Sequence, residues 1–221
     1  AFSDELQQEW TWTERYAAQP EILAYAQHVA DRFDLRRDIA FNTKATAATF
    51  DSQARTWCVE TDRGERLSAR FCIMATGNLS TTNLPTIEGL RTFRGATYHT
   101  GHWPHQTVDF TGQRVGIIGT GSSAIQAIPM IAAQARHLTV FQRTANYVIP
   151  AWNGPLAAET VRQVKANYPA LRVQQRATFS HNMFEVATKS ALEASPEERQ
   201  QVYERRWREG GLGFLSAFTD L

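Results

Sequence analysis

Cysteine and long hydrophobic runs are both scarce in this sequence of 221 residues. The two cysteines, Cys58 and Cys72, lie in apolar runs typical of strands, so we interpret them as buried small side chains and not as a disulfide or reactive thiols. No apolar run approaches the roughly 20 residues that a membrane-spanning helix needs, and the polar, acidic start is unlike a signal peptide. We therefore expect a cytoplasmic protein with no membrane partner.

An excess of charge of either sign is also missing. The formal net charge is +1, with 23 Lys and Arg against 22 Asp and Glu. A charge this small gives no reason to expect nucleic acid as a partner. With 43% hydrophobic and 20% charged residues the composition is that of an ordinary globular protein, and the length predicts one or two domains. Function must therefore be inferred from local sites.

The first third of the sequence predicts a helix followed by short strands. Apolar residues recur at helical spacing in PEILAYAQHVADRF, which begins at Pro20. The runs KATAATF, WCVETD and RLSARFCIMATG are separated by polar turns. They predict an antiparallel hairpin that leads into a buried strand ending at Thr76 and Gly77.

The last third of the sequence is helical in pattern. Ser195 is predicted to cap a helix that begins at Pro196 and stops at Gly210. Beyond it Leu212, Leu215 and Phe218, with Leu221 as a possible addition, are expected on one helical face beside Phe214. No later segment covers this face, so we expect it to be exposed.

Gly119, Gly121 and Ala124 form a G-x-G-x-x-A pattern between the apolar strand VGIIG and a helical pattern. In a dinucleotide-binding fold the first glycine allows a tight turn, the second lets the backbone approach a pyrophosphate, and the small third residue lets helix pack on strand. The anion lies at the helix N-terminus, where N–H groups and the helix dipole favour it. This context favours dinucleotide binding over glycines that only permit a close turn. Neighbouring hydroxyl groups that add hydrogen-bond donors are those of Thr120, Ser122 and Ser123.

The next strand, LTVFQRT, ends in polar residues that bear on the choice of nucleotide. An NAD-binding fold usually has Asp or Glu there, whereas this chain has Gln142, Arg143 and Thr144. A carboxylate would repel a 2′-phosphate, and a guanidinium can bind it with two hydrogen bonds. Arg143 therefore favours NADP over NAD, with a merely solvated arginine as the alternative.

Three histidines, His99, His102 and His105, are spaced three apart in FRGATYHTGHWPH. Imidazole is a common metal ligand, but no Asp, Glu or Cys lies between them. Stacking the three rings would also need a helix to continue through Pro104, which proline disfavours. We predict that this stretch is not a metal site.

The same stretch resembles the signature of type I Baeyer–Villiger monooxygenases, F-x-G-x-x-x-H-x-x-x-W-P. The matching positions are Phe93, Gly95, His99, Trp103 and Pro104. The related N- and S-oxygenating flavin monooxygenases have a similar Phe-Gly-His pattern but typically lack the Trp-Pro end. The resemblance covers nearly the whole chain, including GTGSSAIQ and VFQRTANYVIPAWNGPL, and is closest to the cyclohexanone and phenylacetone monooxygenase group.

This resemblance implies an α/β fold with a Rossmann-like NADP-binding domain that carries a helical insertion, plus part of a Rossmann-like FAD domain. It implies the cofactors FAD and NADP, and the oxidation of a ketone by oxygen to an ester or lactone. The implied domains are a partial FAD domain at 1–84, a linker with the signature at 85–110, the first part of the NADP domain at 111–153 and the insertion at 154–221.

Roles for individual residues also follow from the resemblance. As catalytic residues it implies His99, which anchors the linker, and Trp103, which lies toward the nicotinamide. The pyrophosphate side falls to Gly119, Thr120, Gly121, Ser122, Ser123, Ala124 and Gln126, and the 2′-phosphate to Arg143 and Thr144. On the FAD side it implies Ala45, whose backbone meets the adenine, with Thr76 and Gly77.

Family members begin with a G-x-G-x-x-G for FAD and continue to a Lys-Arg pair. This sequence contains neither of these features. The resemblance therefore implies an internal fragment or truncated copy that is inactive by itself. Its unpaired sheet edges would be covered by a complementing segment or by self-association. Three alternatives stay open: an N- or S-oxygenating flavin monooxygenase, a non-catalytic NADP-binding module, and a Rossmann dehydrogenase, which would need an acid or base not recognisable after Thr144.

Overall fold

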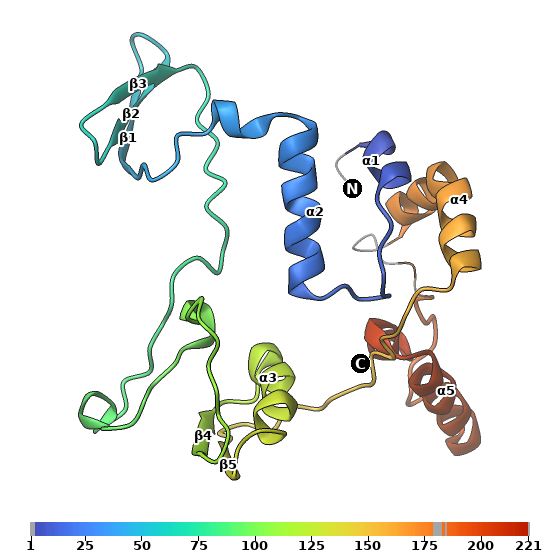
Figure 1. The fold of residues 1–221 in the computed structure, drawn as a ribbon. Helices are drawn as coiled ribbons and strands as arrows, with labels where there is room; N and C mark the ends of the chain where they lie inside the picture. The colour runs from blue at the N-terminus through green and yellow to red at the C-terminus, as the bar shows by residue number, and fades with distance from the viewer. Residues whose placement is uncertain (1–2, 179–182, 184, 221) are drawn as a thin grey trace. The chain divides into compact units, whose positions relative to one another are not determined.

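The computed structural model describes residues 3–178, 183 and 185–220. They fall into two compact units, traced by the colours of Figure 1. Unit 1 comprises residues 1–41 and 148–221, and unit 2 comprises residues 42–147. No helix in the described part is long and apolar enough to cross a membrane.

Unit 1 is helical, and its first core forms where two N-terminal helices meet. Its α-helices are α1 (Asp4–Glu9), α2 (Gln19–Arg32), α4 (Ala158–Ala177) and α5 (Pro196–Glu209), with 3-10 helices η1 (Leu35–Asp38) and η5 (Gly211–Ser216). The predicted amphipathic helix is confirmed as α2, which has a proline in its first turn and buries Tyr25 and Val29. These two side chains cluster with the fully buried Leu6 of α1, and Trp10 and Trp12 pack against the cluster.

The two sequence-distant parts of unit 1 are joined by hydrogen bonds. Lys165 Nζ of α4 donates to the Gln8 carbonyl at 2.6 Å, and Gln8 Nε2 donates to the Lys165 carbonyl at 2.9 Å. Nearby, Asn153 Nδ2 donates to Glu14 Oε2 at 2.8 Å. Unit 1 therefore depends on contacts between residues more than 130 positions apart.

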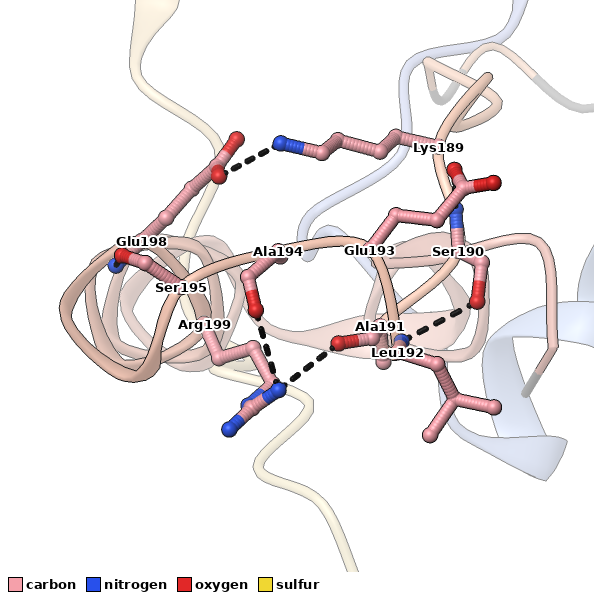
Figure 2. A network of polar contacts seen from close by, with 9 residues as sticks. All are labelled: Lys189, Ser190, Ala191, Leu192, Glu193, Ala194, Ser195, Glu198 and Arg199. Carbon is pink, nitrogen blue, oxygen red and sulfur yellow. Dashed lines mark hydrogen bonds and ion pairs between the residues drawn. The ribbon is translucent and has the colours of Figure 1, made fainter.

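Helix α5 has the ends that its sequence predicts. Ser195 Oγ accepts a hydrogen bond from the Glu198 N–H at 3.1 Å, and Gly210 ends the helix with a φ of 69°. The preceding turn is tied to the helix, as Figure 2 shows: Lys189 pairs with Glu198 at 2.6 Å, and Arg199 donates to the carbonyls of residues 191 and 194.

The expected exposure is confirmed for Leu212 and Leu215, which are 59% and 58% exposed, and is wrong for Phe214 and Phe218; Leu221 lies outside the described residues. Phe218 is 4% exposed and Phe214 is half-buried. Both rings contact Tyr203 of α5, with ring centroids 5.3 Å from Phe218 and 5.8 Å from Phe214. The chain after α5 turns back on that helix, so an earlier segment covers the two rings.

Unit 2 contains the predicted antiparallel hairpin. Strands β1 (Ala45–Asp51), β2 (Thr56–Thr61) and β3 (Arg66–Ala69) form a sheet in the order β1-β2-β3. Both sheet contacts are antiparallel. Because the strands alternate with short polar turns, neighbours in sequence are neighbours in the sheet.

The predicted buried strand ending at Gly77 is wrong. Strand β3 stops at Ala69, and residues 71–77 have no regular structure, with Phe71 77% and Ile73 88% exposed. No described strand pairs with this segment, so its apolar residues have no sheet to enter. The two cysteines are free thiols, as expected, but both are half-buried, so the predicted full burial is also wrong.

The predicted strand–turn–helix–strand segment is confirmed in unit 2. Strand β4 (Arg114–Ile118), helix α3 (Ser122–Ala132) and strand β5 (His137–Phe141) follow one another, and β4 pairs with β5 in parallel (Figure 1). The connection from β3 to β4 carries two 3-10 helices, η2 (Leu90–Thr92) and η3 (Thr100–His102). The parallel pair brings the end of β5 beside the turn that follows β4.

Candidate functional site

The turn between β4 and α3 has the backbone geometry that an anion site needs. Gly119 has a φ of 102°, in the left-handed region that favours glycine, and its N–H donates to the Phe141 carbonyl at 2.8 Å. Gly121 caps α3 through its backbone, and no side chain caps the first turn of this helix. A Cβ added at either glycine would meet nothing within 4 Å. The N–H groups that begin α3 are therefore open to an approaching group such as a phosphate.

Side chains after β5 reach the glycine turn. Gln142 Nε2 donates to Thr120 Oγ1 at 2.8 Å, and Asn146 Nδ2 donates to the Thr120 carbonyl at 3.2 Å. Arg143 and Thr144 follow Gln142 and are exposed. The Arg143 guanidinium has no hydrogen bond or ion pair with any residue that the structure describes. A cation without a partner therefore lies next in sequence to a residue that contacts the turn.

The other predicted pyrophosphate residues lie at the start of α3. Ser122 and Ser123 are exposed in the first turn of the helix, and Ala124 is half-buried. Gln126 Nε2 donates to the Ser122 carbonyl at 2.9 Å, so in this structure its amide is engaged within the helix. The structure thus brings the G-x-G-x-x-A residues and the end of β5 to one place.

Sequence reasoning did not assign Asn146 to this site, nor a bond from Gln142 to Thr120. The sequence does show that Asn146 is a second side-chain amide shortly after β5, but it does not show which acceptor this amide contacts. Only the parallel pairing of β4 and β5 identifies its acceptor.

The signature stretch has a compact local structure. His99 Nδ1 accepts a hydrogen bond from the Gly101 N–H at 3.0 Å, which caps η3. A Cβ at Gly95 would lie 2.5 Å from the Phe93 ring, so only glycine permits that ring position. Two of the signature's fixed residues therefore shape this stretch through contacts within it.

Trp103 is held by aromatic neighbours and remains 42% exposed. Its ring centroid lies 5.6 Å from that of Tyr98 and 6.2 Å from that of Phe110. Phe110 is 7% exposed, and Pro104 directly follows Trp103. The rings of Tyr98 and Phe110 thus hold Trp103 in place while leaving it partly exposed.

No metal cluster accompanies the histidines. In residues 3–178, 183 and 185–220, no group of three or more His, Cys, Asp or Glu side chains could hold an ion. The Nδ1 lone pair of His99 is already used by Gly101. The hydrogen bond gives His99 a structural task in the turn.

The residues expected on the FAD side lie outside the glycine turn. Ala45 begins β1 and pairs with Thr61 of β2. Thr76 and Gly77 lie in the segment without regular structure, and Gly77 has a φ of 71°. Among the described residues, no hydrogen bond links any of them to the turn at Gly119–Ala124.

A cavity of about 630 Å³ lies in unit 1, between α1 and α4. Its lining includes Gln7, Tyr168 and Arg172, and the last pairs with Asp4. None of the predicted site residues lines it. This cavity is thus separate from the residues of the candidate nucleotide site, which lie in the turn before α3 and after β5.

Comparisons with known proteins agree with the motifs. Residues 1–201 match the model of a family described as pyridine nucleotide-disulphide oxidoreductase. A Baeyer–Villiger monooxygenase of Pseudooceanicola batsensis is 44% identical over 218 residues, which cover 99% of this chain and 40% of the relative. A cyclohexanone 1,2-monooxygenase of Acinetobacter sp is 40% identical, with 99% and 40% covered. The chain thus spans about two fifths of the length of these curated relatives.

Two further matches bear on the chemistry and the fold. A phenazine N-monooxygenase of Lysobacter antibioticus is 39% identical over 100% of this chain and 41% of its own length. A solved structure of an oxidised steroid monooxygenase bound to NADP is 56% identical and has a TM-score of 0.92, over 100% of this chain and 42% of that one. This likeness confirms the predicted α/β fold with Rossmann-type cofactor domains.

Proposed function

Since the chain belongs to the pyridine nucleotide-disulphide oxidoreductase family, we propose that it serves an FAD- and NADPH-dependent Baeyer–Villiger oxidation of ketones to esters or lactones. A relative named a Baeyer–Villiger monooxygenase and one named a cyclohexanone 1,2-monooxygenase each match 99% of the chain, which supports the proposal together with the signature at Phe93–Pro104. Oxygen and a small ketone are the proposed co-substrates. The proposed domains remain 1–84 for FAD, 85–110 for the linker, 111–153 for NADP and 154–221 for the insertion.

The observation that carries this proposal is the open glycine turn, contacted by Gln142, with the exposed Arg143 next in sequence. The start of α3 has no side-chain cap, and the space at both glycines is open, so the residues present fit a pyrophosphate. The Arg143 guanidinium has the charge and the planar donors that a ribose 2′-phosphate requires. Thr144 adds a hydroxyl beside it. When bound, NADPH supplies reducing equivalents and FAD supplies the chemistry that activates oxygen.

The linker residues are proposed to place the nicotinamide end of the nucleotide. His99 holds the turn at η3 through its bond with Gly101, and Trp103 is 42% exposed beside Tyr98. On the FAD side the proposal assigns the backbone of Ala45 to the adenine, and it assigns Thr76 and Gly77 to the same domain.

The free state of both cysteines supports a proposed cytoplasmic location, since reducing compartments keep thiols unpaired.

The decisive test is nucleotide selectivity. Arg143→Ala is expected to weaken NADP⁺ binding by roughly 10- to 100-fold, the range for lost hydrogen bonds to a charged group, and to leave NAD⁺ binding within about threefold. Calorimetric titration with both nucleotides measures this. Arg136→Ala is the matched control, because Arg136 is an exposed arginine just before the other end of β5. An unchanged ratio of the two affinities in Arg143→Ala would overturn the proposal for NADPH.

N-oxygenation is the second candidate, favoured by the match to the phenazine N-monooxygenase. Trp103 and Pro104 favour Baeyer–Villiger oxidation, because the N- and S-oxygenating enzymes that resemble this chain typically lack that pair. Product analysis on a longer version of the chain that carries the missing ends, supplied with FAD, NADPH, oxygen and either a ketone or an amine, separates them. An ester or lactone supports the first candidate, and an N-oxide supports the second.

A further inference from the structure

Thr120 stands between the two glycines of the turn, and its side chain is tied to the residues after β5. Gln142 Nε2 donates to Thr120 Oγ1 at 2.8 Å. Asn146 Nδ2 reaches the same oxygen at 3.5 Å and donates to the Thr120 carbonyl at 3.2 Å. Together with the backbone bond from Gly119 to Phe141, these contacts hold the turn on β5.

The direction of these bonds decides what the Thr120 hydroxyl can do. A hydroxyl has one hydrogen to donate and two lone pairs to accept with. Gln142 and Asn146 both donate to Thr120 Oγ1, so the hydroxyl accepts these two hydrogen bonds through its oxygen lone pairs. Within the described residues, Thr120 Oγ1 donates to no acceptor. Its hydrogen is therefore left for a group outside the chain, and donation into the oxygen makes that hydrogen a better donor.

We propose that Gln142, assisted by Asn146, is a positioning residue that dedicates the Thr120 hydroxyl to donating to the pyrophosphate of the bound nucleotide. This inference rests on the proposed function and deepens it. It separates two tasks at the end of β5. Gln142 acts on a group that NADH and NADPH share, whereas Arg143 acts on the 2′-phosphate that distinguishes them.

The chemistry of position 142 explains why an amide serves there and a carboxylate does not. A carboxylate only accepts hydrogen bonds, so a glutamate would take the hydrogen of the Thr120 hydroxyl. It would also place a negative charge near the pyrophosphate, which Coulomb repulsion disfavours. The amide at position 142 thus has two effects: it donates a hydrogen bond to Thr120, and it adds no negative charge that would repel a 2′-phosphate.

A double-mutant cycle tests the proposal. Gln142→Met keeps the side-chain length and removes the donor, and Thr120→Val keeps the shape and removes the hydroxyl. Gln142→Met is expected to weaken binding of NADP⁺ and NAD⁺ alike by roughly three- to tenfold, and Thr120→Val by about tenfold or more. The double variant should bind no more weakly than Thr120→Val, because Gln142 acts through that hydroxyl. Thr120→Ser, which keeps a hydroxyl, should restore binding to within about threefold of the unaltered protein.

Calorimetric titration measures the affinities, and thermal unfolding of each variant shows that the fold persists. Full additivity of the two changes, an altered NADP⁺ to NAD⁺ ratio in Gln142→Met, or no weakening at all would each overturn the inference. Failure of the proposed function looks different: the unaltered protein binds neither nucleotide, or Arg143→Ala leaves its selectivity unchanged. Where Arg143→Ala shifts the ratio and Gln142→Met changes nothing, the function stands and the inference falls.

Discussion

Unit 1 and unit 2 hold their structures in different ways. Unit 1 buries apolar side chains in two clusters, one around Leu6 and one around Phe218. Unit 2 relies on backbone pairing between strands, and its buried apolar side chains in the described residues are Phe110 and Ile131. A site that needs a defined backbone, such as the glycine turn, occurs in the unit that backbone pairing organises.

The two units also differ in how far apart in sequence their partners lie. Lys165 and Gln8 are separated by 157 positions, whereas the turn residue Thr120 and Gln142 are separated by 22. Short separations cost little loop-closure entropy, so contacts within the β4–α3–β5 segment cost less chain entropy than those between the two parts of unit 1. Unit 1 requires both of its sequence segments at once.

The largest expected effect is the loss of a buried leucine from unit 1. Leu6 is fully buried, whereas Leu67 in unit 2 is 56% exposed. Leu6→Ala should lower the free energy of unfolding by about 3 kcal/mol, because it removes apolar contact and leaves a cavity. Leu67→Ala should lower it by less than about 1 kcal/mol. Urea unfolding measures both, and equal losses would contradict the contrast between the units.

A smaller effect is expected from a change at the glycine turn. Gly119→Ala puts a side chain at a φ of 102°, which costs about 1–2 kcal/mol if the turn keeps its shape. If the turn shifts to relieve this strain, nucleotide binding, which needs the native turn, should weaken by up to the same free energy, roughly 5- to 30-fold. Gly64 in the β2–β3 turn has a φ of 77° and open space around it, so Gly64→Ala is the matched control. It should lose similar stability and keep its nucleotide affinity. Titration and unfolding together separate strain from function.

The helix starts provide a third contrast, because α5 is capped by a side chain and α3 is not. Ser195→Ala removes the bond to the Glu198 N–H and should cost about 1 kcal/mol of stability. Ser122→Ala at the start of α3 should change stability by less than about 0.5 kcal/mol. Thermal unfolding compares the two, and a larger loss in Ser122→Ala would show that α3 is not open at its start.

The smallest effect is a local opening at acid pH. Hydrogen bonds from the Ala191 N–H and the Ser190 hydroxyl hold the pKa of Asp220 below its ordinary value of 3.8. A lowered pKa means that the folded state favours the ionised carboxylate. This stability is present above the ordinary value and is lost as pH falls through the folded value. The Ala191 amide should therefore be protected from hydrogen exchange at neutral pH, and this protection should be lost as the pH falls below 3.8.

The strand ladder of β4 and β5 is the internal control for that experiment, because it contains no carboxylate. Its protection should persist at the pH where the Ala191 amide opens. Asp220→Asn should abolish the pH dependence at Ala191. Loss of protection in both places at the same pH would indicate global unfolding instead.

Much of the local structure could be predicted from sequence, and so could the position of the candidate nucleotide turn. Helix α2, the hairpin, the β4–α3–β5 segment and the cap at Ser195 follow from spacing and turn residues. The strand predicted to end at Gly77 failed for a different reason. Apolar composition suits a strand, but a strand also needs a neighbour for its N–H and C=O groups, and the described residues provide none there.

Three features can be identified from residue order because each depends on residues close together in the chain: the glycine turn, the cation that follows β5 and the signature at Phe93–Pro104. The packing of Phe218 on Tyr203 and the hydrogen bond from Gln142 to the Thr120 hydroxyl could be found only in the folded chain. A side chain's partner across a strand pair or helix contact is set by strand register and packing, and the residue spacing within one segment specifies neither.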